Sequence, residues 1–168
     1  LIKYFMDIIM IAMYMYGTAE LTLVSEKIGQ NKYCDIKGLT IVGILISIVI
    51  YVVLSMIILI FSDKVPMLIS NETALIEGAA KLIFPMVLMN LFNPIQTILK
   101  YVLLACGKAK SVLYIIALIN AVVLLYITMT YFIGSKLYFV FIGLFINYFA
   151  LSLIYAVYLR KFYFRTKI

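Results

Sequence analysis

Residues 39–61 read LTIVGILISIVIYVVLSMIILIF, a run that contains no charged side chain. An α-helix needs about 20 apolar residues to cross the hydrocarbon core of a bilayer, and this run is long enough. The whole chain has the same character, since 67% of its 168 residues are hydrophobic and 12% are charged. A soluble protein has about half and about a quarter, respectively. With a mean hydropathy of +1.18, the sequence predicts an all-α membrane protein.

Four further runs have a similar length and composition, so we expect five transmembrane helices. The predicted spans are residues 4–25, 39–61, 80–104, 111–133 and 137–159. Before the third span, Ser70 or Asn71 can cap a short outer surface helix at about residues 70–79. The first run lacks the basic stretch of a secretory signal. Because Leu1 rather than Met opens the chain, we expect a piece of a longer protein.

Basic residues gather in alternate loops. One side of the predicted membrane holds ten of the fourteen: Lys27, Lys32, Lys37, Lys100, Lys108, Lys110, Arg160, Lys161, Arg165 and Lys167. The positive-inside rule makes this side, with the C-terminus, cytoplasmic. We therefore expect a multi-pass protein of the cell membrane whose net charge of +7 reports topology in the lipid bilayer and not a nucleic-acid partner. Cys34 and Cys106 then lie near the cytoplasmic face.

The third span carries most of the candidate site residues. Its sequence, KLIFPMVLMNLFNPIQTILKYVLLACGK at 81–108, places two prolines and several polar residues at membrane depth. Pro94 has no N–H to donate, so it predicts a helix kink that leaves the carbonyl oxygen of Asn90 free. At about 100° per residue, Asn90, Asn93 and Thr97 share one face. Gln96 points about 120° away from Asn90 and is expected to stand apart.

The role of this polar face has two interpretations. Polar side chains inside a membrane face a partner helix or a wet cavity in preference to lipid. Asn90, Asn93 and Thr97 therefore either join helices, at about 0.6 kcal/mol each, or line a cavity for a substrate or ion beside the Pro94 kink.

Glu20 is an acid inside the first predicted span. It follows Tyr16 by four residues, so the tyrosine hydroxyl could hydrogen-bond the carboxylate. An intramembrane acid is a candidate for proton or cation coupling, so Glu20 with Tyr16 is a candidate pair for that role. The alternative is that the carboxylate reaches water, because Glu20 is only about three turns from the cytoplasmic end.

The composition argues against an enzyme and against a bound metal or cofactor. The chain has no His and two distant cysteines, so the usual ligand spacings of metal and redox sites are absent. It also offers no acid pair and no nucleophile with an adjacent base. The GKAK segment at 107–110 lacks the glycine-rich run of a nucleotide-binding loop, which argues against direct ATP drive.

Two segments resemble the multidrug and toxic compound extrusion (MATE) family. GTAELTLVSEKIG at 17–29 is similar to a family helix that begins Gly-x-Ala and ends in a Val-Gly-Gln-x-Leu-Gly turn. The matching residues are Gly17, Ala19, Leu23, Val24 and Gly29, whereas Ser25 and Glu26 replace the usual Gly and Gln. LLACGKAKSVLYIIALINAVVLLYI at 103–127 resembles the Leu-x-x-x-Gly-x-x-Lys turn after the tenth helix. We expect Gly29 to adopt the left-handed conformation that closes its helix.

The resemblance implies that residues 1–168 are helices eight to twelve of a twelve-helix transporter, a partial six-helix C-terminal lobe whose partner is the missing N-terminal lobe. It also implies an antiporter that exports amphipathic or cationic small molecules against inward Na⁺ or H⁺ flow by alternating access. Some family members have a cation-site acid on the tenth helix, where this chain has Asn90 and Asn93. A cation site on that helix is therefore not implied here.

Two other functions remain open. A flippase for lipid-linked saccharides, from the same superfamily, needs cationic side chains to meet a pyrophosphate. The central stretches of the predicted spans carry no Arg or Lys, which argues against it. The other alternative is a membrane structural subunit without transport activity.

Overall fold

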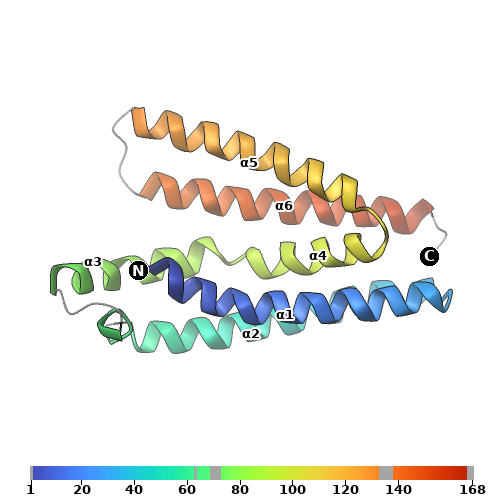
Figure 1. The fold of residues 1–168 in the computed structure, drawn as a ribbon, viewed down its shortest axis with the longest axis horizontal. Coiled ribbons are helices and arrows are strands. Elements are labelled where there is room, and N and C mark those ends of the chain that lie inside the picture. Colours follow the sequence, from blue (N-terminus) through green and yellow to red (C-terminus); the bar gives the residue numbers. More distant parts are fainter. Residues whose placement is uncertain (1, 63, 69–72, 133–137, 166–168) are drawn as a thin grey trace.

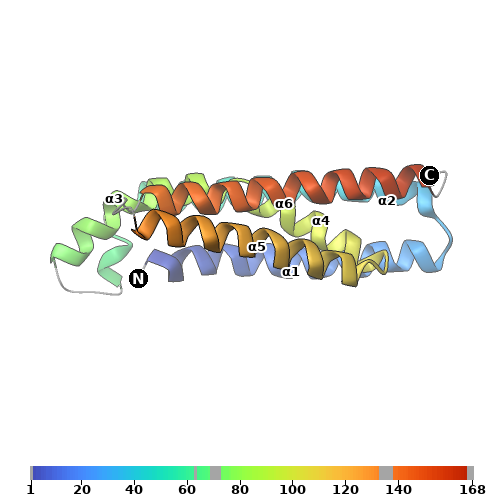
Figure 2. The same ribbon diagram turned by 90° about the horizontal axis from the view of Figure 1, so that it is seen from above.

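A computed structural model describes residues 2–62, 64–68, 73–132 and 138–165. In these ranges the chain is helical, as the composition predicts. The elements are α1 (Ile2–Gly29), α2 (Tyr33–Ile60), the short 3₁₀ helix η1 (Pro66–Leu68), α3 (Thr73–Met89), α4 (Asn93–Ala105), α5 (Ala109–Phe132) and α6 (Tyr138–Arg165). The long helices lie side by side in an elongated bundle (Figures 1 and 2).

Within the described part of the chain, three helices are long and apolar enough to cross a membrane: α2, α5 and α6. They coincide with the second, fourth and fifth predicted spans. The pair α3 and α4 adds a fourth if the two are taken as one span with a 44° bend. The first predicted span also forms a helix, α1, but its less apolar sequence leaves its crossing of the membrane a prediction.

The expected outer surface helix does not stand apart from the third span. Its residues from Thr73 onward and the following residues up to Met89 form the single helix α3, while residues 69–72 lie outside the described part of the chain. Pro85 is accommodated inside this helix. The interruption in the predicted third span comes instead between Met89 and Asn93.

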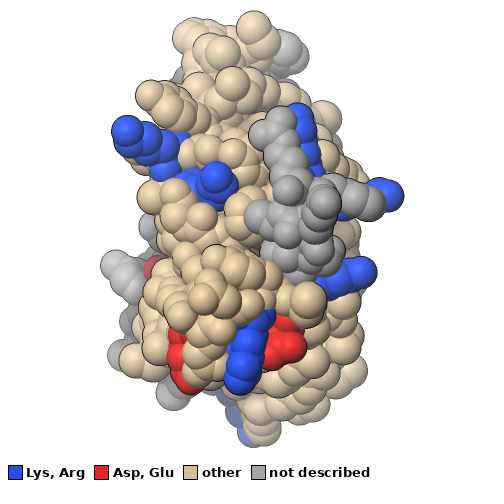
Figure 3. Space-filling model, turned by 90° about the vertical axis from the view of Figure 1, so that its right-hand side faces the viewer, with Lys and Arg blue, Asp and Glu red and all other residues tan. Residues whose placement is uncertain are grey.

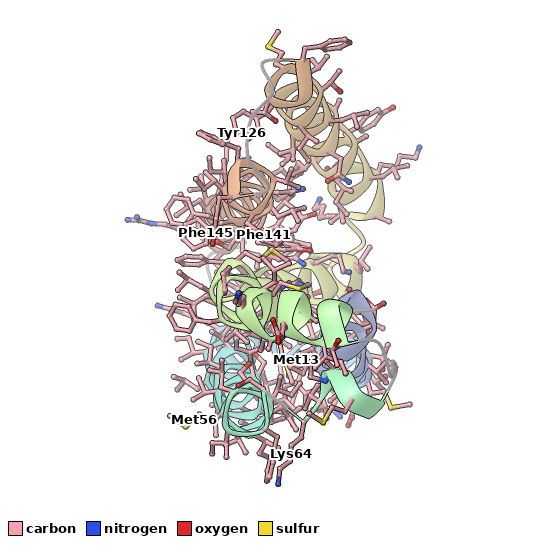
Figure 4. The ribbon with its side chains drawn as sticks, turned by 90° about the vertical axis from the view of Figure 1, so that its left-hand side faces the viewer. Met13, Met56, Lys64, Tyr126, Phe141 and Phe145 are labelled. Carbon is pink, nitrogen blue, oxygen red and sulfur yellow. The ribbon has the colours of Figure 1, made fainter. Side chains whose placement is uncertain are left out.

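Helix α4 is at the centre of the bundle. It contacts α1 and α2 on one side and α6 on the other, and α5 packs mainly on α6 (Figure 1). The α5–α6 contact is close at Gly143, which faces the ring of Tyr126, and the amide of Asn147 donates a 3.0 Å hydrogen bond to Asn120. Figure 4 shows Tyr126 on α5, with Phe141 and Phe145 on α6.

Two apolar clusters form the core, one toward each end of the bundle. The first lies between α1, α2 and α3 and includes Met10, Met13 and Tyr51. The second surrounds α4 and includes Val24, Ile98, Val102 and Tyr155, among others. The interruption between α3 and α4 lies where the two clusters meet.

The turn between α1 and α2 closes differently from the prediction for Gly29. Gly29 ends α1, and the left-handed residue is Asn31, with φ of 57°. The N–H groups of Asn31 and Lys32 donate to the carbonyls of Ile28 and Lys27, which is the Schellman pattern. The prediction for Gly29 was therefore wrong: Gly29 is still helical, as the last residue of α1, and the left-handed position falls on Asn31. After glycine, asparagine is the residue that best tolerates this conformation. Gly107, with φ of 72°, closes α4 in the same way.

Basic residues gather at the end of the bundle that holds the α1–α2 turn, the α4–α5 turn and the end of α6 (Figure 3). An ion pair of 3.5 Å between Lys27 and Asp35 joins α1 to α2 at this end. The helix arrangement thus brings the basic segments that follow α1 and α4, and the basic residues Arg160 and Lys161 near the end of α6, to one end, as the charge pattern predicts. Its cytoplasmic location remains a prediction.

Candidate functional site

The candidate site begins at the break between α3 and α4. The N–H of Asn93 donates a 2.9 Å hydrogen bond to the carbonyl oxygen of Asn90, so the prediction of a free carbonyl there was wrong. Pro94 lies in the first turn of α4, where a helix has no partner for the N–H that proline lacks. The chain therefore bends before the proline, over residues 90–92, and restarts as a new helix.

Four side chains at the break form one hydrogen-bonded network. The amide of Asn93 donates to Asn90 Oδ1 at 3.1 Å, and the amide of Gln96 donates to Asn93 Oδ1 at 2.7 Å. The same Gln96 amide lies 3.2 Å from Thr97 Oγ1. The predicted set of Asn90, Asn93 and Thr97 is thus brought together by the structure.

Gln96 belongs to this network, which corrects the expectation that it stands apart. The expected 120° separation assumed one continuous helix from Asn90 to Gln96, and the break interrupts that count. Within α4, Gln96 follows Asn93 by three residues, so the two are neighbours on the helix surface.

The network is enclosed by the bundle. Its four members are exposed by 4%, 3%, 7% and 0% in chain order. Asn90 also donates to the carbonyl of Met86 at 3.0 Å, and the Asn93 amide lies 3.4 Å from the sulfur of Met10 on α1. In this conformation the amides mainly satisfy one another, so the network joins the α3–α4 break to α1.

Glu20 is the second predicted site residue, and it is buried at 2% exposure. The interpretation that its carboxylate reaches water therefore does not hold for this conformation. Its carboxyl group lies against Gly43 of α2, where an added Cβ atom would be 2.9 Å from Cδ and both oxygens. A side chain at this position would force the carboxyl group to move, so the glycine leaves space for the acid in this conformation.

The expected hydrogen bond from Tyr16 to this acid is absent at Oε1. Among the described residues, Oε1 of Glu20 has no hydrogen-bond partner, although Tyr16 is one turn away on α1. A buried carboxyl oxygen without a partner is costly. The arrangement suits a carboxyl group that binds a proton or meets a cation, and Glu20 and the amide network occupy different places on α1 and α4.

Lys100 is a functional candidate that the sequence reasoning missed. We counted it with the cytoplasmic loop, yet its Nζ lies over the rings of Tyr14 on α1, at 5.5 Å, and Tyr101, at 4.9 Å. Tyr14 is near the middle of α1 and is itself exposed, so this half-buried ammonium lies beside α1, about halfway along that helix. The helical period could have revealed it, because Lys100 follows Asn93 by seven residues and lies within about 20° of it.

The structure holds no candidate metal centre within its described ranges: no three His, Cys, Asp or Glu side chains come together there. The site is therefore a set of neutral amides, one isolated carboxyl group and one ammonium over two aromatic rings. Such a set can bind a solute or a proton, but it lacks a nucleophile with an activating base.

Comparison with known proteins identifies the family. A family model described as MatE matches residues 2–132, a range that contains α1 to α5. No curated protein and no solved structure matches the chain. Because the family match extends over well more than half of the 168 residues, the chain belongs to the multidrug and toxic compound extrusion (MATE) family.

Proposed function

We propose that this chain is the C-terminal lobe, helices eight to twelve, of an antiporter that exports amphipathic or cationic small molecules in exchange for Na⁺ or H⁺. Membership of the MatE family supports a membrane transporter. In this proposal α1 and the bent α3–α4 pair both cross the membrane, which gives five spans. The lobe works by alternating access with an N-terminal lobe as its partner.

The observation that carries the proposal is the polar network at the helix break. Interrupted backbone at membrane depth is tolerated where it is buried in protein or lines a water-filled cavity. Discontinuous helices of this kind form the substrate and ion sites of many transporters. We propose that Asn90, Asn93 and Thr97 face the substrate path in one state of the transport cycle and are closed off, as here, in the other.

Glu20 is the proposed coupling residue, with Tyr16 beside it. Its carboxyl group is buried against Gly43 and has no basic partner within ion-pair distance in the described structure. A charged carboxylate in such a place is unfavourable unless it binds a cation or a proton. Binding and release of that ion would make the conformational equilibrium depend on the ion gradient.

Replacing Glu20 with Gln tests this assignment, since the amide keeps the shape and cannot ionise. Substrate efflux from vesicles of the full-length protein should lose its response to an imposed Na⁺ or H⁺ gradient, while downhill substrate exchange continues. Glu26→Gln is the matched control, because Glu26 is exposed on the same helix and its carboxylate accepts a hydrogen bond from Gln30 one turn away. Gradient-driven efflux that is equally fast in Glu20→Gln and Glu26→Gln would remove Glu20 from the coupling mechanism.

The lipid-linked saccharide flippase remains a second candidate because of Lys100. The expectation that the central stretches of the spans carry no Arg or Lys argued against it, whereas the half-buried ammonium of Lys100 lies over the rings of Tyr14 and Tyr101, about halfway along α1. A cation there suits a phosphate group. Movement of a fluorescent lipid-linked saccharide across vesicles, with no export of cationic dyes, would favour the flippase. Neither activity in correctly folded protein would favour a structural subunit.

A further inference from the structure

A cavity of about 510 Å³ lies between α2 and α6, near the basic end of the bundle. Its described lining joins an apolar wall to basic and hydroxyl side chains: Lys37, Thr40, Ile41, Ile44, Leu99, Ala156, Leu159, Arg160 and Tyr163. None of the candidate site residues above contributes to it. The lining contains two basic residues and no acid, so the cavity has a positive bias.

The charged and apolar parts of the cavity are at different depths. Lys37 is in the second turn of α2 and Arg160 is in the last two turns of α6. Ile44 lies seven residues beyond Lys37 along α2, which is about 10 Å deeper at 1.5 Å per residue. The basic residues thus form the rim at the end of the bundle, and the apolar wall extends from that rim along the helices.

Two hydroxyl groups link the walls of the cavity just inside the rim. Thr40 Oγ1 and the hydroxyl oxygen of Tyr163 are 3.1 Å apart, joining α2 to α6 across the cavity. Thr40 also donates to the carbonyl of Ile36 at 2.8 Å, so the Tyr163 hydroxyl can act as the donor to Thr40. Both side chains are held in place by this contact.

We propose that the cavity binds an anionic phospholipid, with its phosphate at Lys37 and Arg160 and an acyl chain along the apolar wall. Arg and Lys at helix ends on the cytoplasmic side are a recognised pattern for lipid head groups, and guanidinium binds phosphate through two parallel hydrogen bonds. The apolar wall selects a lipid over free phosphate, because a free ion would leave that wall without an apolar partner. This inference does not depend on the transported substrate.

Photo-crosslinking tests the occupant directly. Benzoylphenylalanine replaces Ile41, which lines the cavity and is 50% exposed, in the full-length protein reconstituted with equal amounts of phosphatidylglycerol and phosphatidylcholine. The control carries the same group in place of Val122, which is 56% exposed on α5. Mass spectrometry of the crosslinked peptide then identifies what each position contacts.

At position 41 we expect phosphatidylglycerol adducts to exceed phosphatidylcholine adducts by about tenfold, because two basic residues at the membrane surface favour an anionic head group. Position 122 should follow the equal bulk composition. The double variant Lys37→Gln with Arg160→Gln should remove the preference at position 41. The matched variant Lys110→Gln with Lys161→Gln, which removes the same charge from exposed residues outside this cavity, should keep it.

Three results would overturn the proposal. Equal adducts of both lipids at position 41 would show that the cavity has no selectivity for an anionic lipid. A crosslink from position 41 to a peptide would show that a protein segment fills the cavity instead. Loss of the phosphatidylglycerol adducts on adding excess inorganic phosphate would show a site for the free ion.

Discussion

Replacing Gly43 with Ala tests whether the buried carboxyl group of Glu20 packs against this position. The new Cβ would be 2.9 Å from three carboxyl atoms of Glu20, whereas favourable carbon contacts are about 3.5–4.0 Å. The carboxyl group must therefore withdraw by about 0.6–1 Å, and overpacking of this kind costs about 1–3 kcal/mol. Alanine is the better helix former by about 0.5–1 kcal/mol, which leaves a net loss of up to about 2.5 kcal/mol.

The effect of Gly43→Ala on the free energy of unfolding should change sign when the acid is removed. In a Glu20→Ala background the contact no longer exists, so Gly43→Ala should raise the free energy of unfolding by about 0.5–1 kcal/mol. The difference between the two backgrounds is the coupling energy of the pair, about 1–3 kcal/mol. It can be measured by reversible SDS unfolding of the full-length protein in mixed micelles, followed by circular dichroism.

Gly38→Ala is the control for this cycle. Gly38 lies in α2 as well, and a Cβ there would meet nothing within 4 Å. It should give a small stabilisation in both backgrounds. If Gly43→Ala changes the free energy of unfolding equally in the native and the Glu20→Ala backgrounds, to within about 0.5 kcal/mol, the carboxyl group is not held against Gly43.

Four further predictions concern the break and the thiols. Pro94→Ala should straighten the α3–α4 junction and lower transport more than stability, and unchanged efflux at equal expression would contradict this. Gln96→Leu should lower the free energy of unfolding by about 1 kcal/mol by breaking the network. An unchanged free energy of unfolding would show that Gln96 does not stabilise the network. Burial raises the pKa of Cys106 to about 11, so its alkylation should rise about tenfold per pH unit below that value and stay slower than that of exposed Cys34. An impermeant reagent outside intact cells should label neither cysteine, and prompt labelling of either would refute the cytoplasmic assignment.

Hydropathy and charge predict the helices well because they depend on long runs of residues. The runs at 39–61, 111–133 and 137–159 correspond to α2, α5 and α6, although α2 begins six residues before its run and α6 ends six residues after its own. The third run failed as a single helix because its interruption depends on local bonding at Asn90, which a window of average hydropathy does not detect. Pro94 correctly indicated the region of the interruption, but it did not indicate that the helix stops at Met89.

Side-chain partners were predictable only within one helix. The face shared by Asn93 and Thr97 was predicted from the helical period. The nearby position of Lys100 could have been predicted in the same way. The contact of Glu20 with Gly43 joins residues of two helices, and a single sequence gives no information on how those helices rotate against each other. For the same reason the sequence could not decide whether Glu20 is buried between helices or exposed to water near a helix end.

The break between α3 and α4 also affects how the chain enters the membrane during synthesis. Helix α4 has 13 residues, about 20 Å of helix, and cannot cross a hydrocarbon core of about 30 Å by itself. If α3 and α4 form one bent span, as proposed above, the translocon takes them up as one segment, although they finish as two helices. A polar insertion at Leu91 would leave two segments too short to partition into lipid, whereas the same insertion at Ser62, after α2, would only lengthen a loop.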